Sequence, residues 1–197
     1  AFYSCDGLTS ITIPDSVTHI YSEAFYDCDN LKNTYYTGTI DQWVSIYMQN
    51  KWANPLYYSD CFYIDDELVT DVVISNTSIG FASFYGYSPL KSVTFAEGVT
   101  TIDMNAFACC SSLQSVTISD SVTSIGYNAF GDCSSLQSIT IPKSVTKIDN
   151  SELSTLGLET RVPNIDKSAL EQGTTATYKH PKQPLQVQTG SVVTYSI

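Results

Sequence analysis

The chain has 197 residues, and its net charge at neutral pH is −11 because 20 acidic residues outnumber nine basic ones. This charge argues against a nucleic-acid partner, since binding phosphates requires a surface rich in Lys and Arg. Only 15% of the residues are charged, yet no run approaches 18 apolar residues, so the sequence predicts no membrane span.

One short pattern recurs along the chain. It opens with an Ala-Phe pair at Ala1, Ala24, Ala106 and Ala129, and Ser83 stands in the same place one period before Ala106. The last two copies start 23 residues apart. Each copy continues with apolar residues at fixed places, as in Leu113, Val116, Ile118, Val122 and Ile125. Repetition at such a period predicts a solenoid, in which stacked coils bury a core that no single coil could bury.

Within each copy, alternating apolar residues predict a short parallel strand. Ile139 and Ile141 would point into the core and Thr140 away from it. Pro142 lacks the N–H that a strand ladder needs, so it would end the strand. Residues 122–125 predict a second short strand on another side of the coil. A later place holds Gly or Asp, which predicts a turn near positive φ at Gly80, Asp103, Gly126 and Asp149.

The regular period stops after Leu31 and returns at Ser83, which predicts an insertion over about residues 32–68. Thr39 and Gln42 have the spacing of a capping box. The apolar residues that follow lie on one face of a predicted helix that Asn54-Pro55 would end: Ile40, Trp43, Val44 and Tyr47. Residues 61–64 and 68–74 predict two strands around a turn at Asp65-Asp66. The bend that follows the second strand is expected to be shorter than in a regular coil.

The pattern fades after residue 150, so we expect the solenoid to span residues 1–172 with a degenerate capping coil over about 150–172. Residues 173–184 are rich in Thr, Lys and Pro and predict an extended linker. Residues 185–197 alternate around Thr189-Gly190 and predict the truncated start of a following β module. Because the chain opens in the middle of the pattern, we expect it to be a piece of a longer protein.

Six cysteines raise the alternatives of disulfides, a metal site or buried thiols. Four of them share one repeat place: Cys5, Cys28, Cys110 and Cys133. Stacked coils would bring Cys110 and Cys133 within disulfide range, but their side chains would point the same way, which suits a bridge badly. Zinc would need paired spacings and His partners that the chain lacks. We therefore predict buried thiols.

This pattern resembles the BspA-type leucine-rich repeat family, whose unit is close to AFxxCxxLxxIxIPxSVTxIGxx. The copies that begin at Ala1, Ala106 and Ala129 match it almost place by place, and the resemblance covers about residues 1–150. The resemblance implies a right-handed leucine-rich-repeat coil of about 23 residues per turn, mainly β with irregular turns, here with one helical insertion. It also implies a secreted or cell-surface location in a host-associated bacterium, and a role in adhesion.

No catalytic set can be assembled from the sequence. His19 sits in a repeat place that accepts several residue types, and His180 lies in the predicted linker, so neither is expected to be catalytic. The carboxylates of residues 65–67 could bind calcium, but they lack the alternating spacing of a calcium loop and better suit a solvated turn. We therefore predict no enzyme activity, no metal and no cofactor.

Two surfaces are candidates for binding. Nine aromatic residues lie between Leu31 and Tyr63, and either they form the private core of the insertion or some of them, Trp52, Tyr57 and Tyr58, form an exposed platform. The second candidate is the outward row on the strands, which could equally be a merely soluble Thr ladder. Its members are Thr12, Tyr35, Thr94, Thr117 and Thr140. We expect a monomeric recognition or adhesion segment that binds a host protein or polysaccharide. The alternative is a structural spacer that projects other surface modules.

Overall fold

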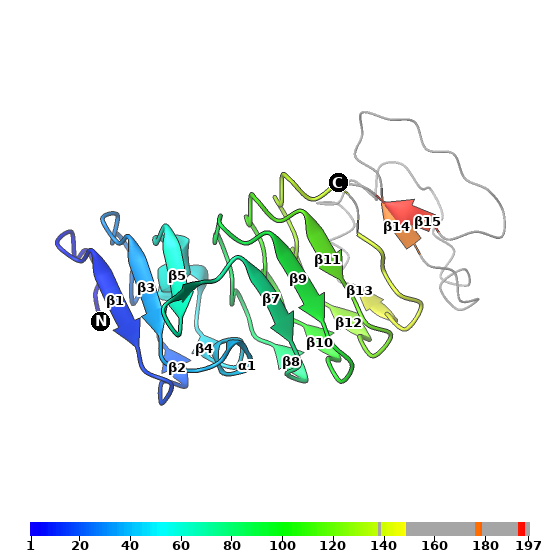
Figure 1. Cartoon of the computed structure of the whole chain (residues 1–197), viewed down its shortest axis with the longest axis horizontal. Helices are drawn as coiled ribbons and strands as arrows, with labels where there is room; N and C mark the ends of the chain where they lie inside the picture. Colours follow the sequence, from blue (N-terminus) through cyan, green and yellow to red (C-terminus); the bar gives the residue numbers. More distant parts are fainter. Residues whose placement is uncertain (138, 149–175, 179–192, 196–197) are drawn as a thin grey trace.

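The computed structural model describes residues 1–137 and 139–148, together with the backbone of two short strands near the C-terminus. The chain is wound into a stack of coils, with one strand of each coil on each of two sides (Figure 1). The predicted fold class, a mainly β repeat solenoid, is confirmed, and the described residues contain one four-residue α-helix.

Each coil contributes one strand to a first ladder along one side of the stack. Its strands are β1 (Ser10–Ile13), β3 (Asn33–Tyr36), β5 (Cys61–Ile64), β6 (Glu67–Leu68), β7 (Asp71–Ile74), β9 (Ser92–Phe95) and β11 (Ser115–Thr117). They form two sheets, one from β1 to β6 and the other from β7 to β11. All pairs are parallel except β5 with β6, and the register places Thr94 opposite Thr117, 23 residues further along the chain. Val93 and Phe95 are buried, whereas Thr94 between them is only half-buried. The predicted alternation is therefore confirmed.

A second ladder of two-residue strands runs along another side. Its strands are β2 (His19–Ile20), β4 (Tyr47–Met48), β8 (Ser78–Ile79), β10 (Thr101–Ile102), β12 (Ser124–Ile125) and β13 (Lys147–Ile148). They form two sheets, one of β2 and β4 and the other from β8 to β13. The strand predicted within residues 122–125 is β12, which pairs in parallel with β10 and β13. In each regular coil the Ile of this strand points into the core.

The third side, here called the loop side, carries the segment from each Ala-Phe pair to the following Leu. Its backbone also bonds from coil to coil: the Phe84 N–H donates to the Ala106 carbonyl (2.7 Å), and the Phe107 N–H to the Ala129 carbonyl (2.8 Å). Backbone bonds thus connect neighbouring regular coils on all three sides, which fixes their relative position.

Left-handed backbone occurs twice per coil, at places that the sequence did not predict. One place precedes the Ala-Phe pair, as in Asn105 and Asn128, and the other follows it, as in Asp27 and Asp132. Neither Gly80 nor Gly126 has positive φ, and Asp149 lies outside the described residues, so the predicted turn is wrong where it can be seen. Gly126 is needed for a different reason, since a Cβ there would lie 2.5 Å from the Met104 amide nitrogen of the preceding coil.

Equivalent side chains stack in rows inside the core. The ring centroids of Phe84 and Phe107 are 5.4 Å apart and those of Phe107 and Phe130 are 5.5 Å apart, with nearly parallel planes. Within the described residues, which hold all six cysteines, no disulfide forms. The Cys28 and Cys110 thiols instead donate to the Phe carbonyl of the preceding coil, at 2.9 and 3.1 Å. The buried-thiol prediction is confirmed for the row, except that Cys5 in the first coil is half-buried.

The irregular segment makes one layer of the stack thicker. β5 pairs with β3 at an offset of 28 residues, and β5 and β6 then form a hairpin before β7 resumes the parallel ladder. Asp65 and Asp66 both have positive φ, so the predicted turn between the strands is a two-residue type I′ turn. Helix α1 (Ile40–Trp43) lies in the same layer of the stack, on the side of the second ladder. Val44, which follows this helix, accepts a hydrogen bond through its carbonyl from the Gly80 N–H of the next coil (2.9 Å).

Large side chains fill this thick layer. The Trp43 ring lies 4.7 Å from the Phe62 ring and 5.2 Å from the Tyr36 ring, and all three are buried. Tyr87 occupies the place that Cys holds in other coils, and its hydroxyl donates to the Val69 carbonyl (2.8 Å) and accepts from the Phe62 N–H (3.2 Å). The interpretation of the aromatic cluster as a private core therefore holds for these residues.

The predicted helix is wrong in its length. The capping box at Thr39 and Gln42 is present, but α1 ends at Trp43, well before the predicted end at Asn54. Tyr47 lies in β4 opposite His19 and is 52% exposed, because the second ladder requires an extended chain at this point. Two 3₁₀ turns, η1 (Lys51–Ala53) and η2 (Pro55–Tyr57), then return the chain along the loop side.

Polar side chains join the two parts of the stack on either side of the thick layer. The buried Asn54 amide donates to the Ala82 carbonyl (2.7 Å), and the Trp43 indole N–H donates to the Ser83 carbonyl (2.9 Å). The Asp41 carboxylate accepts from the Ser75 N–H (2.8 Å), the Asn76 N–H (3.1 Å) and the Ser75 hydroxyl. In this layer, side-chain hydrogen bonds take the part that backbone hydrogen bonds have between regular coils.

Near the C-terminus, β14 (Ala176–Tyr178) and β15 (Val193–Tyr195) pair in parallel. The predicted capping coil, and most of the predicted linker and following β module, lie outside the described residues. Among the helices that the structure describes, none has the length and apolar character needed to cross a membrane.

Replacing Asp41 by Ala should lower the free energy of unfolding by about 1–2 kcal/mol near neutral pH, because several hydrogen bonds to a charged, partly exposed acceptor disappear. Burial opposes ionisation of Asp41 most strongly, but the hydrogen bonds from Ser75 and Asn76 together outweigh it and lower the pKa of the carboxyl. The carboxylate therefore stabilises the fold above its unfolded pKa, and this contribution is lost as the pH falls. In chemical denaturation, the difference in free energy of unfolding between D41A and the unmodified chain should become smaller below about pH 4.

Asp120→Ala, at an exposed carboxylate, is the control and should change the free energy of unfolding little. An equal loss in both variants would contradict the role given to Asp41.

Alkylation without reductant should distinguish two classes of thiol. Cys5, Cys61 and Cys109 are half-buried and should react first, whereas Cys28, Cys110 and Cys133 are fully buried and should react only after unfolding. Burial, followed by the neighbouring Cys133 and Cys109, raises the pKa of the Cys110 thiol, which slows it further. Mass spectrometry of the unfolded chain should find six modified cysteines; a pair that stays unmodified until reduction would show a disulfide instead.

Candidate binding surfaces

The outward side chains of the first ladder form one candidate surface. Thr117 and Thr140 are exposed, and Thr94 is half-buried beside them. Further toward the N-terminus the row becomes apolar: Tyr35 stacks on Tyr63 with ring centroids 5.0 Å apart, and Val73 opposite Thr94 is 67% exposed. The predicted Thr row is therefore interrupted: Thr12 lies opposite Tyr35 in the first coil, and the continuous run of Thr begins at Thr94.

Aromatic side chains gather on the loop side, where five of them form what is here called the aromatic ridge. Its members are Tyr3, Tyr26, Trp52, Tyr57 and Tyr58. The rings of Tyr3 and Tyr26 stack at 5.3 Å, the rings of Tyr26 and Trp52 meet edge to face at 5.8 Å, and those of Tyr57 and Tyr58 do so at 4.9 Å. Tyr3 is 56% exposed and Tyr57 is 39% exposed, whereas Tyr26, Trp52 and Tyr58 are half-buried.

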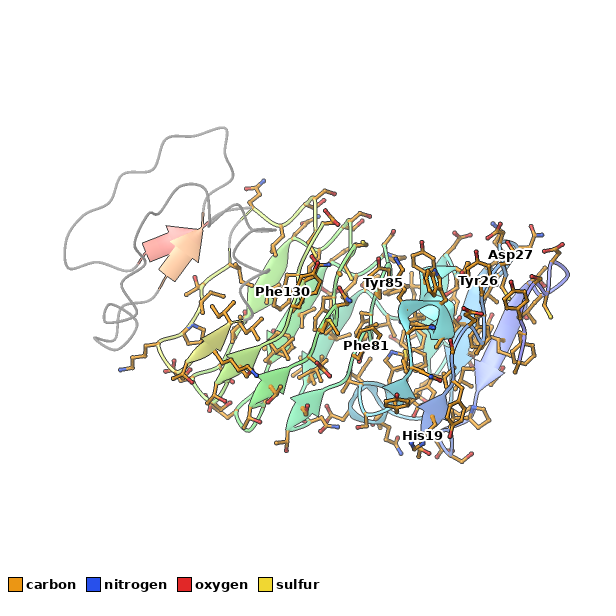
Figure 2. The ribbon with its side chains drawn as sticks, turned by 180° about the vertical axis from the view of Figure 1, so that it is seen from behind. His19, Tyr26, Asp27, Phe81, Tyr85 and Phe130 are labelled. Atoms are coloured by element: carbon orange, nitrogen blue, oxygen red, sulfur yellow. The ribbon has the colours of Figure 1, made fainter. Side chains whose placement is uncertain are left out.

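Lys51 and Tyr85 connect the two halves of the ridge. The Lys51 ammonium lies 5.3 Å from the Trp52 ring centroid and 5.2 Å from that of Tyr85, and it donates to the Tyr85 hydroxyl (3.3 Å). Tyr85 is nearly buried, and its ring lies 5.4 Å from Tyr57. Tyr26 and Tyr85 lie on the same side of the stack in Figure 2, with Asp27 beside Tyr26. Burial, with the Cys109 thiol as the next cause, raises the pKa of Tyr85, so this phenol stays neutral.

Local structure explains why the ridge residues hold their positions. Tyr3, Tyr26 and Tyr85 share the place two residues after each Ala or Ser that opens a coil, so stacking aligns them. Trp52 lies in η1, whose first turn is capped by the Asn50 side chain, and its carbonyl accepts from the Phe25 N–H (3.2 Å). Tyr57 packs over Gly86, where a Cβ would lie 2.8 Å from the tyrosine ring.

Carboxylates surround the ridge. The Asp27 N–H donates to the Tyr58 hydroxyl (3.3 Å), and the charge of Asp29 adds to the burial that raises the pKa of Tyr58. The charge of Asp132 likewise helps to raise the pKa of Tyr85, after burial and the Cys109 thiol. Both signs of charge therefore lie next to the ridge, with Asp27 bonded to Tyr58 and the Lys51 ammonium between the Trp52 and Tyr85 rings.

The structure divides the predicted binding residues between two faces. Tyr35, Thr94, Thr117 and Thr140 lie on the first ladder, whereas Trp52, Tyr57 and Tyr58 lie on the loop side. Sequence reasoning missed Tyr3, Tyr26 and Tyr85, although their shared repeat place was visible. It also missed Lys51, whose contact with Tyr85 depends on how η1 fits between two coils.

The described residues contain no group of three or more His, Cys, Asp or Glu side chains that could hold a metal ion. His19 is exposed, and its ring lies 5.5 Å from Tyr47 and 6.1 Å from Tyr21 on the second ladder. Asp65 and Asp66 form the type I′ turn described above. His180 lies outside the described residues.

Three solved structures illustrate what the chain is similar to. A leucine rich cell surface protein from Faecalibacterium prausnitzii is 26% identical, with a TM-score of 0.44, over 93% of this chain and 50% of that protein. A leucine-rich repeat protein from Treponema pallidum is 22% identical, with a TM-score of 0.37, over 80% of this chain and 73% of its own. A leucine-rich repeat protein from Bacteroides ovatus is 20% identical, with a TM-score of 0.31, over 72% of this chain and 54% of its own. The chain thus spans half the length of the Faecalibacterium protein, and no curated protein matches it.

The family comparison agrees with the repeat seen in the sequence. The model of the BspA type leucine rich repeat region matches six copies, over residues 1–49 and 57–178. The gap between the two matches coincides with η1 and the start of η2, where the stack departs from its regular coil. The chain belongs to the BspA-type leucine-rich repeat family.

Proposed function

We propose that this chain is a non-catalytic recognition segment of a bacterial cell-surface protein and binds a host protein or polysaccharide. The observation that carries this proposal is that Tyr3 and Tyr57 are exposed on one side of the stack, with the half-buried rings of Tyr26, Trp52 and Tyr58 beside them. Aromatic rings left in solvent are unfavourable unless a partner covers them, so a connected row of them marks a contact surface. The surface location rests on the family.

The non-catalytic part of the proposal rests on the layout of polar groups. Among the titratable residues with clearly shifted pKa values, Asp41 and Tyr87 have structural hydrogen-bond partners. Asp41 bonds Ser75 and Asn76, and Tyr87 bonds Val69 and Phe62. Neither set combines a nucleophile with a base in the arrangement that acyl or phosphoryl transfer requires.

The alternative, a structural spacer, is supported by the regular Thr row. Thr94 and Thr117 lie directly opposite each other on successive strands, as expected for a polar face that only needs to be compatible with solvent. A spacer would not need the aromatic ridge, whereas a recognition surface would. We therefore favour recognition.

A binding screen with two matched variants tests this function. The chain should bind, saturably, at least one member of a panel of extracellular matrix proteins and immobilised glycans. The ridge variant Tyr3→Ala/Tyr26→Ala/Tyr57→Ala should lose this binding, and the strand-face variant Thr94→Val/Thr117→Val/Thr140→Val should retain it. Circular dichroism would verify that both variants are folded. If the folded, unmodified chain binds no member of the panel, the spacer function replaces the recognition function.

A further inference from the structure

We propose that an extended, positively charged segment of another protein docks on the first ladder by adding a strand to the free edge of β7. The site lies between β6 and β7, where the two sheets of this ladder are separated, and is here called the ladder break (Figure 1). The ladder break lies on a different side of the stack from the aromatic ridge. This inference therefore goes beyond the function proposed above and does not depend on it.

Main-chain groups of β7 point into the ladder break. The Ile74 carbonyl accepts a hydrogen bond from the chain just after β9 (2.9 Å). Because successive residues of a strand direct their main-chain groups to opposite edges, those of Asp71 and Val73 point away from β9. The next N–H on this edge, that of Ser75, donates to the Asp41 carboxylate (2.8 Å). Among the described residues, the main-chain groups of Asp71 and Val73 have no protein partner.

The outward face at the ladder break is apolar. The register places Tyr35 opposite Tyr63 and Tyr63 opposite Leu68, so an apolar row reaches the break from one side. Val73 lies on the other side, in the place that Thr94 fills on the next strand. Leu68 is 44% exposed and Val73 is 67% exposed, whereas the two Tyr rings are half-buried. Exposed apolar side chains beside an unpaired strand edge mark a surface that a partner would cover.

Charge at the ladder break selects the sign of the partner. Asp65, Asp66 and Glu67 of the β5–β6 hairpin are all exposed. Among the described residues one ion pair forms, between Lys32 and Asp60, so the three hairpin carboxylates have no cationic partner. A segment that carries Lys or Arg would complement them. A second copy of this chain that paired through the same edge would instead bring identical carboxylates to the interface, and such charges protect an edge against self-association.

The main-chain pattern of the site selects an extended peptide over a helix or a sugar chain. On the free edge of a strand, an N–H and a carbonyl recur every second residue, about 6.7 Å apart. Another extended backbone presents donors and acceptors at this repeat, whereas a helix uses its main-chain groups internally. Alternate side chains of the added strand would lie on the outward face, where apolar ones would cover Leu68 and Val73. The edge is short because Asp41 occupies it at Ser75, so a segment of a few residues would fill it.

Fluorescence anisotropy with labelled, end-capped octapeptides tests the inference on the full chain. A peptide that alternates Val and Lys should bind saturably. Replacing every Lys by Glu should weaken binding at least about tenfold, because the charge attraction becomes repulsion. Methylating the backbone nitrogens of the Val/Lys peptide should weaken binding by a similar factor, at least about tenfold, because its main-chain donors are removed. Added salt should weaken the binding of the unmethylated Val/Lys peptide.

Two matched substitutions on the same face locate the site. Val73→Lys places a positive charge on the edge and should weaken binding of the Val/Lys peptide at least about tenfold. Thr140→Lys adds the same charge at an exposed place several strands away and should change affinity less than about twofold. Circular dichroism would verify that both variants are folded. The ridge variant described above should bind this peptide as tightly as the unmodified chain does.

Each contrary result removes a definite part of the inference. A folded chain that does not bind the Val/Lys peptide, or that binds it equally well with Val73→Lys, would overturn the site. Equal binding of the methylated peptide would overturn strand addition, and equal binding of the Glu peptide would overturn the positively charged partner. Dimerisation of the unmodified chain that Val73→Lys abolishes would assign the edge to a second copy instead. The function proposed for the aromatic ridge stands or falls separately, through its own variant.

Discussion

The structure depends on backbone hydrogen bonds between successive coils on three sides of the stack. They are made by the two strand ladders and by the loop-side amides, such as the Phe107 N–H on the Ala129 carbonyl. Because these bonds fix each regular coil over the previous one, any residue type that recurs in the repeat becomes a row in space. Phe rings, thiols and outward Thr hydroxyls are all arranged this way, so the core and the surface follow from one constraint.

The thick layer shows how the chain departs from this constraint without breaking the stack. Extra residues enter on two sides at one level, as α1 and as the β5–β6 hairpin, and Trp43, Phe62 and Tyr87 fill the added volume. Side-chain bonds from Asn54 and Asp41 replace the missing backbone ladder. The same irregularity brings η1 and η2 onto the loop side, where Lys51 and Tyr57 join an aromatic row that the regular repeat had begun with Tyr3 and Tyr26.

Local features could be predicted from the sequence, and features that depend on distant partners could not. The period, the capping box at Thr39, the turn at Asp65-Asp66 and the buried thiols follow from short-range spacing. The helix was predicted too long because Trp43, Val44 and Tyr47 fit a helical face, whereas pairing with β2 requires a strand at Tyr47. Tyr3, Tyr26 and Tyr85 share a visible repeat place, but their continuation through Lys51 depends on packing between coils far apart in sequence.

Distances along the first ladder test the stacked arrangement most directly. Spin labels carried by an unnatural amino acid leave the native cysteines untouched, and they can replace Thr12 together with Thr94, Thr117 or Thr140. Pulsed electron resonance should give distances that increase in this order by about 4.8 Å for each added coil. Distances that stay constant or decrease along the series would contradict a stack of coils, and with it the row of rings proposed to bind a ligand.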